Sequence, residues 1–585
     1  MYKLSNLPSK FSVSILNSFD FGGPDGKDDS LLETCALITD PINEFLEENK
    51  SIIVGDRGTG KTAIFRLLSE KKIKFKTSGK YQQIYVAIDE DLGYKTLREH
   101  VSTQIQDSTR AGSAQHRIVW ELFFLSRCLE AISQKMGTNP KFIALRDRFY
   151  KAVGWNSQQK IGLLDVLLHT KKTFGVKLEG GHLGYVIPNF YTSLESKAPS
   201  ELPLDSSQML DLPSIKSDLD RLLAESKIVI YLLVDKIDEF VSGEDYETQR
   251  QMLQALIQCW RDYQAYPRVK IKLFLRRDLY ERLDFSAIGR DKIDPKKVEL
   301  KWSEEDIRKF VAMRILHNIA PHLNNRTIRL ECDEANLKIS KSFLKEIRAL
   351  DSIPEHEIPQ WKRLRRWILR FRAKLSGRKL DEYDARTTSF QDIVCQSIMT
   401  LFLPRLVNHL NRSCKQETMS IVEYFSTHFQ FATGLTTPRV VLSYLQKCLE
   451  HAKAYYRKNP NQSLSSNEKG EFPLFLRDHL SEAYTDIRLL SLQTVVGLHP
   501  DWNRPAVALL QFMNKSRNPD QIAFKDARKH ISKMLDPGGS AEILIQFFAF
   551  YEHVGLFKCT NRTQRPEERN YHLPIFFQQV PLSVG

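Results

Sequence analysis

Eight residues in the first part of the chain read Gly55-Asp56-Arg57-Gly58-Thr59-Gly60-Lys61-Thr62. They match every fixed position of the phosphate-binding pattern G-x-x-x-x-G-K-[ST]. The apolar residues 51–54 before them predict a buried strand, and residues 63–68, beginning with Ala63, predict the start of a helix. In such a unit the loop N–H groups surround phosphates and the helix N-terminus adds partial positive charge. The stretch, with Ala63, therefore predicts a nucleoside triphosphate site.

Two side chains of this stretch have separate chemical roles. Lys61 is expected to reach the β- and γ-phosphates, and the Thr62 hydroxyl is expected to bind Mg²⁺. The alternative is a glycine-rich turn that matches the pattern by chance. The strand before it and the helix after it favour the phosphate loop.

The most apolar strand of the chain ends in acidic residues. Residues 227–234 are rich in β-branched residues without polar alternation, which is typical of a central strand in a parallel sheet. Asp235 follows directly, where a carboxylate can bind Mg²⁺ at the carboxyl edge of the sheet. Lys236 stands where many ATPases have a catalytic Glu, so Asp238 or Glu239 is expected to supply the base. The alternative is a solvated acidic loop.

Two arginines are further candidates for the site. Arg276 ends the predicted strand 269–275, where it can reach a γ-phosphate; the alternative is a surface pair with Arg277. Arg439 follows a proline at the start of a predicted helix, from which it can turn toward the nucleotide.

Composition limits the class of protein. A chain of 585 residues is too long for one hydrophobic core and predicts several domains. It has no apolar run of membrane-spanning length, and its first residues lack the apolar segment of a secretory signal. The eight scattered cysteines form no C-x-x-C pair, which favours reduced thiols over zinc or disulfides. We therefore expect a cytoplasmic protein without a membrane partner.

The pattern of elements predicts an α/β fold in four parts. A P-loop core is expected from residues 1–90 and 227–302, with further strands at 83–88 and 297–301 and a helix at 247–263. Residues 91–226 form a predicted helical insertion with a helix at 118–136, and residues 303–460 a helical lid. Residues 31–48, before the first strand, are expected to form one helix.

Residues 475–585 are expected to form a winged-helix-like domain. Helices are predicted at 507–513, 525–534 and 541–550, and two wing strands at 555–559 and 571–576. The third helix is too apolar to lie in a DNA groove. If the domain contacts DNA, the better candidates are Lys525, Arg528, Lys529, Lys533, Arg562 and Arg565. Contact with a protein is an equal alternative.

A second basic feature lies within the predicted lid. Residues 361–375 have the pattern of a basic amphipathic helix. A packed helix with a solvated basic face is favoured over a nucleic-acid contact or a membrane or partner surface. The net charge of +14 makes contact with nucleic acid reasonable but does not establish it.

Taken together, the motifs GDRGTGKT, LLVDKIDEF, LFLRRDL and TTPRVV resemble those of bacterial AAA-like and STAND-like P-loop ATPases of the ASCE class. That group includes relatives of origin-recognition and initiator ATPases and of phage-defence ATPases. The resemblance implies a five-stranded parallel sheet in the order 5-1-4-3-2, ATP with Mg²⁺, Arg276 as first sensor and Arg439 as second sensor. Lys236 departs from the pattern of this group, and no arginine finger can be placed.

Three functions follow from this resemblance and composition. The first is an ATP-hydrolysing switch that controls a partner effector protein in antiviral defence. The second is a DNA-dependent ATPase of loader, initiator or transposition-helper type. The third is a nucleotide-binding scaffold that hydrolyses slowly, which Lys236 favours. Assembly into a homo-oligomer stays open.

Overall fold

The computed structural model describes residues 3–5, 10–11, 13–76, 79, 81–89, 112–152, 212–237, 246–281, 283, 289–323, 328–332, 335–339, 390–410, 416–462, 464–465, 473–516, 518–578 and 580. The chain forms two compact units. The sheet unit comprises Pro41–Gly55 and Lys61–Leu300, and the helical unit comprises Met1–Asp40, Asp56–Gly60 and Lys301–Gly585. The predicted basic helix at 361–375 lies outside the described residues.

A parallel sheet of five strands forms the centre of the sheet unit. Its strands are β3 (Ile52–Gly55), β4 (Gln82–Ile88), β5 (Ile228–Val234), β6 (Val269–Arg276) and β7 (Lys297–Glu299). They lie in the order β4-β5-β6-β3-β7, and every neighbouring pair is parallel. When the strands are numbered along the chain from β3, this order reads 5-1-4-3-2 from the β7 edge.

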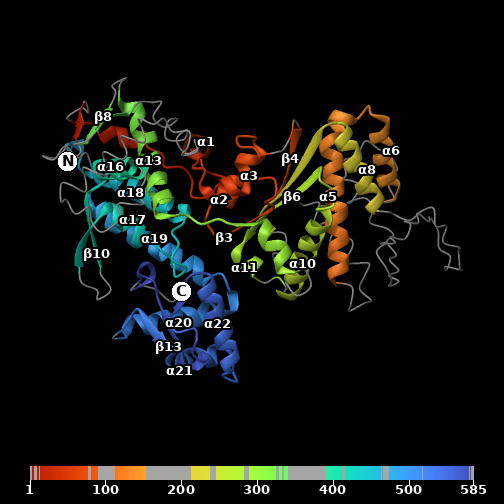
Figure 1. Cartoon of the computed structure of the whole chain (residues 1–585). Helices are drawn as coiled ribbons and strands as arrows, with labels where there is room; N and C mark the ends of the chain where they lie inside the picture. The colour runs from red at the N-terminus through yellow and green to blue at the C-terminus, as the bar shows by residue number, and fades with distance from the viewer. Residues whose placement is uncertain are drawn as a thin grey trace, which may run out of the picture. The chain divides into compact units, whose positions relative to one another are not determined.

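Helices cover one face of this sheet. Alternate residues of β5, from Ile228 to Val234, join a buried apolar cluster with residues of α5 (Gly112–Met136), α8 (Leu212–Glu225) and α10 (Tyr246–Tyr263). Helix α6 (Pro140–Ala152) packs against α8, as Figure 1 shows. The described part of the predicted insertion is thus helical, and the helix predicted at 118–136 lies within α5. All residues of β5 are buried, on either side of the strand, because both faces of the sheet are covered.

Aromatic residues from shorter helices cover the opposite face. Phe274 of β6 has edge-to-face contacts with Phe45 of α2 (Asp40–Phe45) and Phe65 of α3 (Lys61–Ser69), at centroid distances of 5.3 and 5.7 Å. Tyr231 of β5 stacks on Phe75 at 4.5 Å. Two short helices, α11 (Arg277–Tyr280) and α12 (Arg290–Ile293), follow β6 in the chain. The sheet therefore lies between two helical layers, as expected of a parallel α/β fold.

The single helix predicted for residues 31–48 is wrong. The structure has α1 (Leu32–Cys35), which ends where Ala36 takes an extended conformation, and then α2. Pro41 explains the break, because a proline lacks the N–H that a continuous helix needs but is tolerated in a first turn. The apolar spacing alone does not carry this information.

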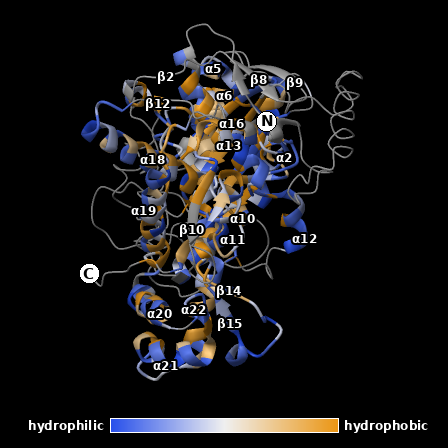
Figure 2. Cartoon of the chain, turned by 90° about the vertical axis from the view of Figure 1, so that its left-hand side faces the viewer, coloured by the Kyte–Doolittle hydropathy of each residue, from blue (hydrophilic) through white to orange (hydrophobic). Residues whose placement is uncertain are grey.

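The helical unit contains more strands than the sequence predicts. Its helices are α13 (Glu304–Ile319), α16 (Phe390–Phe402), α17 (Ile421–Thr427), α18 (Pro438–Lys458) and α19 (Arg477–Val496). Strands β8 (Ile328–Cys332) and β9 (Ala335–Ile339) pair with β1 (Lys3–Ser5), β10 (Leu406–Leu410) pairs with β11 (Gln416–Ser420), and β2 (Lys10–Phe11) pairs with β12 (Leu464–Ser465). The expectation of helices alone is therefore wrong here. Figure 2 shows apolar residues around α13 and α16, which pack together.

The end of the chain has three helices and a small sheet. The helices are α20 (Asn503–Lys515), α21 (Phe524–Leu535) and α22 (Ala541–His553). The strands are β13 (Gln521–Ala523), β14 (Lys558–Cys559) and β15 (Asn570–His572), in the antiparallel order β13-β15-β14. The sequence predicts the three helices and two later strands but misses β13, which has only three residues.

Candidate functional site

The loop between β3 and α3 has the backbone that its glycines predict. Gly58 and Gly60 have φ angles of +83° and +97°, in the left-handed region that favours glycine. The Thr59 hydroxyl donates to the Asp56 carbonyl at 2.9 Å and closes a turn. Arg57 is exposed, whereas Thr59 is buried. The loop thus has a defined conformation between a buried strand and a helix.

Lys61 lies across the base of this loop. It is the first residue of α3, and its Nζ donates to the Gly55 carbonyl at 2.8 Å. The residue is only 8% exposed. Thr62 and Ala63, which follow it in the first turn of α3, are partly buried. A buried ammonium group at a helix N-terminus makes this end of the loop electropositive.

Three predicted site elements meet at the carboxyl edge of the parallel sheet. Gly55 lies opposite Arg276 in the pairing of β3 with β6. Asp235 follows β5, the other neighbour of β6, and its backbone N–H donates to the Ile88 carbonyl at 3.0 Å. Asp235 is 3% exposed. The edge where ligands of open parallel sheets bind therefore holds the first glycine of the motif, a buried carboxylate and an arginine.

The residue after Asp235 has an unusual backbone. Lys236 has a φ of +55°, a conformation that a residue with a side chain adopts at a cost. The chain therefore turns immediately after the strand. Ile237 is buried, and the two base candidates, Asp238 and Glu239, lie outside the described residues.

Arg276 has a protein partner in this structure. Its guanidinium donates to both carboxylate oxygens of Asp278, with Nε···Oδ1 at 3.0 Å and Nη2···Oδ2 at 2.8 Å. The neighbouring Arg277 lies 3.5 Å from Glu299. The surface arginine pair considered from the sequence is therefore two separately paired arginines, both largely buried.

A buried lysine in β6 carries no local sequence signal. Lys272 is fully buried, and its Nζ donates to the carbonyl oxygens of Lys50 and Glu47, just before β3. It lies 4.4 Å from the centroid of the Phe75 ring. Burial lowers the pKa of Lys272 well below its ordinary value. These hydrogen bonds connect β6 to the segment that precedes β3.

Arg439 contacts the loop within the helical unit. Its backbone N–H donates to the Gly58 carbonyl at 3.3 Å, and a Cβ added to Gly58 would lie 2.8 Å from the Arg439 Cβ. The guanidinium is held elsewhere: its Nη2 lies 3.1 Å from Asp25 Oδ2, and its Nε lies 3.3 Å from the Pro24 carbonyl. The predicted second sensor is therefore next to the loop, with its charge paired to the N-terminal segment.

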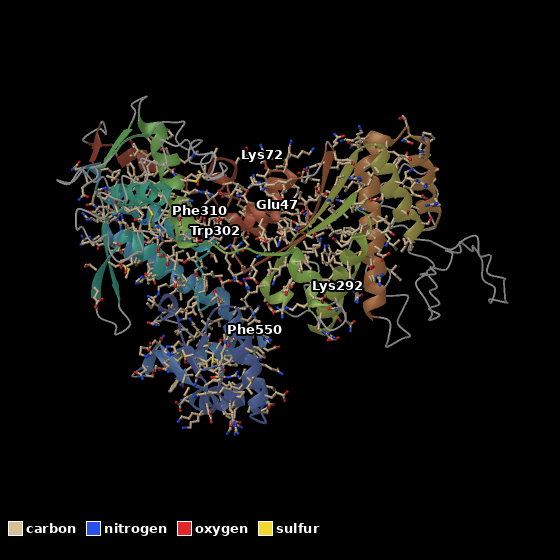
Figure 3. All side chains as sticks on the ribbon, viewed as in Figure 1. Glu47, Lys72, Lys292, Trp302, Phe310 and Phe550 are labelled. Carbon is tan, nitrogen blue, oxygen red and sulfur yellow. The ribbon has the colours of Figure 1, made fainter. Side chains whose placement is uncertain are left out.

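Trp302 is the second contact to the loop and was not identified from the sequence. Its indole Nε1–H donates to the Thr59 carbonyl at 2.8 Å. The residue is 9% exposed, and its ring packs edge-to-face on Phe310 at a centroid distance of 5.5 Å; both residues are labelled in Figure 3. Trp302 and Thr59 are 243 positions apart in the sequence, so a local pattern gives no signal for the hydrogen bond between them.

The residues present fit a magnesium–nucleotide complex. Lys61 and the two left-handed glycines supply an electropositive loop for phosphates. The Thr62 hydroxyl and the Asp235 carboxylate are oxygen groups of the kind that Mg²⁺ prefers, and Mg²⁺ commonly takes one or two carboxylates with substrate phosphates. Among the described residues, no cluster of three or more His, Cys, Asp or Glu side chains is arranged to hold a metal ion.

The comparisons with known proteins found similarity to solved structures and not to sequences. No family model and no curated protein matches the sequence. Among solved structures, the chain is similar to the ORC2 protein of Aeropyrum pernix in its ADPNP–ADP complexes. The identity is 9%, the match covers 90% of this chain and 83% of the other, and the TM-score is 0.31. In the described parts of the chain, no helix has the length and apolarity required to cross a bilayer.

Proposed function

We propose that this chain is a P-loop ATPase that binds ATP with Mg²⁺ and changes state when ATP is hydrolysed. The observation that carries the proposal is the shared sheet edge. There the loop glycine Gly55 lies opposite Arg276, and the buried Asp235 directly follows β5, the strand on the other side of β6. These groups belong to one unit and lie where phosphates bind in parallel α/β folds.

Each residue has a proposed role in the reaction. Lys61 holds the β- and γ-phosphates, and Thr62 with Asp235 holds Mg²⁺, which neutralises phosphate charge when bound. Asp238 or Glu239 orients the attacking water, since Lys236 stands at the usual position of the base. Arg276 exchanges Asp278 for the γ-phosphate and so stabilises charge as the reaction proceeds.

We propose that the loop communicates the nucleotide state to the helical unit. Residues 56–60 belong to that unit, where Arg439 and Trp302 contact two successive loop carbonyls. Arg439, already beside Gly58, would leave Asp25 for a phosphate oxygen. The movement would act on a partner protein, in the phage-defence setting that the motif resemblance implies. Co-purification of a protein partner that depends on ATP tests this part, and an unchanged partner set with ATP and ADP contradicts it.

The catalytic proposal is tested by ATP turnover with single substitutions. Asp235→Asn is expected to abolish Mg²⁺-dependent hydrolysis, because it removes a metal-binding charge. Asp238→Asn and Glu239→Gln are measured separately, and the one that stops turnover while nucleotide still binds identifies the base. Unchanged turnover in both would favour a scaffold that hydrolyses slowly. Asp218→Asn, at a partly exposed position of α8 where the carboxylate pairs with Arg148 and Arg221, is the control for loss of an acidic group.

A DNA-dependent ATPase is the second candidate, and the last domain favours it. The order α20, β13, α21, α22, β14, β15, with the sheet order β13-β15-β14, supports the proposal of a winged-helix-like domain. The apolar side of α22 is buried, so this helix is not free to read bases. Four exposed basic side chains lie on α21, namely Lys525, Arg528, Lys529 and Lys533. Arg562 and Arg565, in the loop before β15, are also exposed, and Arg562 pairs with Glu552.

A salt series with duplex DNA tests this candidate. Binding through phosphates predicts that the logarithm of affinity falls linearly with that of salt concentration. Replacing the four basic residues of α21 by Ala is expected to reduce that slope and any DNA stimulation of hydrolysis. A flat salt dependence without stimulation contradicts the candidate and leaves the ATPase proposal intact.

A further inference from the structure

We propose that Trp302 is a positioning residue for the phosphate loop, which it orients through the Thr59 carbonyl. The inference rests on the proposed function, because it assigns Trp302 a part in holding phosphates. The contact is one indole N–H to one loop carbonyl at 2.8 Å. Trp302 lies two residues after Leu300, outside the P-loop motif.

The planar peptide bond links the direction of the Thr59 carbonyl to the direction of the Gly60 N–H. In a trans peptide the C=O and the next N–H point in opposite directions. The Thr59 carbonyl shares its peptide plane with the Gly60 N–H. Because the Thr59 carbonyl points toward the Trp302 indole, the Gly60 N–H points away from Trp302. Backbone N–H groups of such loops are the phosphate donors, so Trp302 sets the direction of one of them.

The Gly60 side of this peptide is less restricted than the Thr59 side. A Cβ added to Gly60 would meet no atom within 4 Å, so the space around it is open. Glycine also adopts both signs of φ readily, so the Thr59–Gly60 peptide can rotate at low cost. The indole is fixed in turn, since it is 9% exposed and packs on Phe310. The hydrogen bond from a rigid, buried donor therefore favours one orientation of the carbonyl, in addition to the bonds that Thr59 makes to Asp56.

The neighbouring peptide has its own donor. The Arg439 N–H bonds the Gly58 carbonyl at 3.3 Å, while the Thr59 N–H turns back to the Asp56 carbonyl at 3.4 Å. The Thr59 N–H is thus engaged within the loop, and the effect of the Trp302 bond falls on Gly60. Two successive carbonyls are held from outside the loop, one by a backbone donor and one by a side chain. Only the second can be removed by substitution.

The test compares two tryptophan variants of the full chain. Trp302→Phe removes the N–H but keeps an aromatic ring against Phe310. Trp120→Phe is the matched control, because the buried Trp120 also donates its indole N–H to a carbonyl, that of Met252, at 3.2 Å and within the sheet unit. Phe310→Leu is a second variant, which keeps the indole donor but loosens its packing and carries the test if Trp302→Phe does not fold.

Two readouts separate this inference from the proposed function. The first is the Kd for ADP measured by calorimetry. The second, made without nucleotide, is the rate of tryptic cleavage after Arg57, the exposed basic residue of the loop. Trp302→Phe is expected to raise both by about three- to tenfold, the range for loss of one hydrogen bond, and Phe310→Leu by about twofold. Trp120→Phe is expected to leave both at the wild-type value.

The possible results distinguish failure of the positioning role from failure of the proposed function. Equal behaviour of Trp302→Phe and Trp120→Phe in both readouts would overturn the positioning role. Faster cleavage with unchanged ADP affinity would mean that Trp302 holds the loop but does not orient a phosphate donor, which also overturns the proposal. A wild-type chain that binds no ADP would overturn the proposed function, and the cleavage rates would then refer to loop structure alone.

Discussion

Gly55 and Arg276 lie opposite each other in neighbouring parallel strands. The first is the glycine that begins the phosphate loop, and the second ends β6 with its guanidinium bonded to both oxygens of Asp278. The pairing fixes how far the arginine backbone stands from the loop. Asp278 holds the Arg276 side chain in a defined position. In the proposed reaction, a phosphate replaces Asp278 as the hydrogen-bond acceptor. This relationship gives Arg276 its proposed role.

Arg276→Ala is expected to slow ATP hydrolysis by about a hundredfold, as for the loss of one donor to a developing charge. Nucleotide affinity should change much less, because the role is stronger in the transition state than in the ground state. Steady-state kinetics and separate binding measurements distinguish kcat from affinity. Arg277→Ala is the control, since Arg277 pairs with Glu299 instead. Equal kcat in Arg276→Ala and wild type would exclude the role.

The two loop glycines should differ in what they tolerate. Gly60→Ala meets only the backbone cost of a positive φ, about 1–2 kcal/mol for a residue with a Cβ. Gly58→Ala has the same cost and also collides with the Arg439 Cβ at 2.8 Å, which adds about 1–3 kcal/mol of overpacking. Urea unfolding should therefore rank Gly58→Ala as the less stable variant. The reverse ranking would mean that Arg439 does not pack on Gly58.

The sequence predicts the parts of the site that carry local patterns. The P-loop motif and the uninterrupted apolar strand before Asp235 identify the loop and the sheet edge, because buried parallel strands need apolar residues on both faces. Trp302 and Lys272 carry no such pattern. Trp302 reaches Thr59 only through the fold. Lys272 is buried because backbone carbonyls and aromatic rings surround its charge, whereas a lysine in a strand is ordinarily expected to face water.

Other differences come from elements too short or too distant to be read locally. Strand β13 has three residues and pairs with β15, which lies after α22. Strand β1 pairs with β8, more than three hundred residues later. Pairing partners of this kind are set by tertiary structure, so propensity cannot identify them. The break at Ala36 is the exception, because Pro41 was a visible signal for it.

The buried ion pair between Arg314 and Asp29 is expected to be sensitive to the loss of one partner. Arg314 donates to both carboxylate oxygens, at 2.8 and 2.6 Å, and both side chains are at most 5% exposed. Asp29→Asn leaves a buried cation without its counter-ion, which costs about 3–5 kcal/mol. Denaturant unfolding measures the loss. Glu450→Gln, in an exposed pair with Lys447, should cost less than about 1 kcal/mol. Comparable losses in the two variants would contradict this account.

Stability is expected to fall at acid pH through His479 in α19. Burial is the largest cause that lowers the pKa of His479 from 6.5, and the charge of His451 also lowers it, against opposite effects of Glu482 and Asp478. The unfolded chain therefore binds the proton more tightly than the folded chain. The contribution of His479 is complete above pH 6.5 and is lost as the pH falls below that value.

His479→Gln tests this pH dependence. The ring Nδ1 accepts the Leu476 N–H at 3.2 Å at the start of α19, and a glutamine at the third helical position can accept the same bond without titrating. The difference in Tm between pH 5.5 and pH 7.5 should shrink in the variant. An unchanged difference would mean that other groups determine the acid sensitivity.

The central claim is that the loop from Gly55 to Thr62 binds ATP. Its most direct measurement is calorimetric titration of the full chain with ATP and Mg²⁺, for wild type and Lys61→Ala. The account predicts saturable binding to one site in wild type and at least about thirtyfold weaker binding in Lys61→Ala, which loses a charged hydrogen-bond donor. Lys72→Ala, an exposed lysine just after α3 (Figure 3), should bind as wild type does. Absence of binding in the wild type, or equal affinity in Lys61→Ala, would contradict the account.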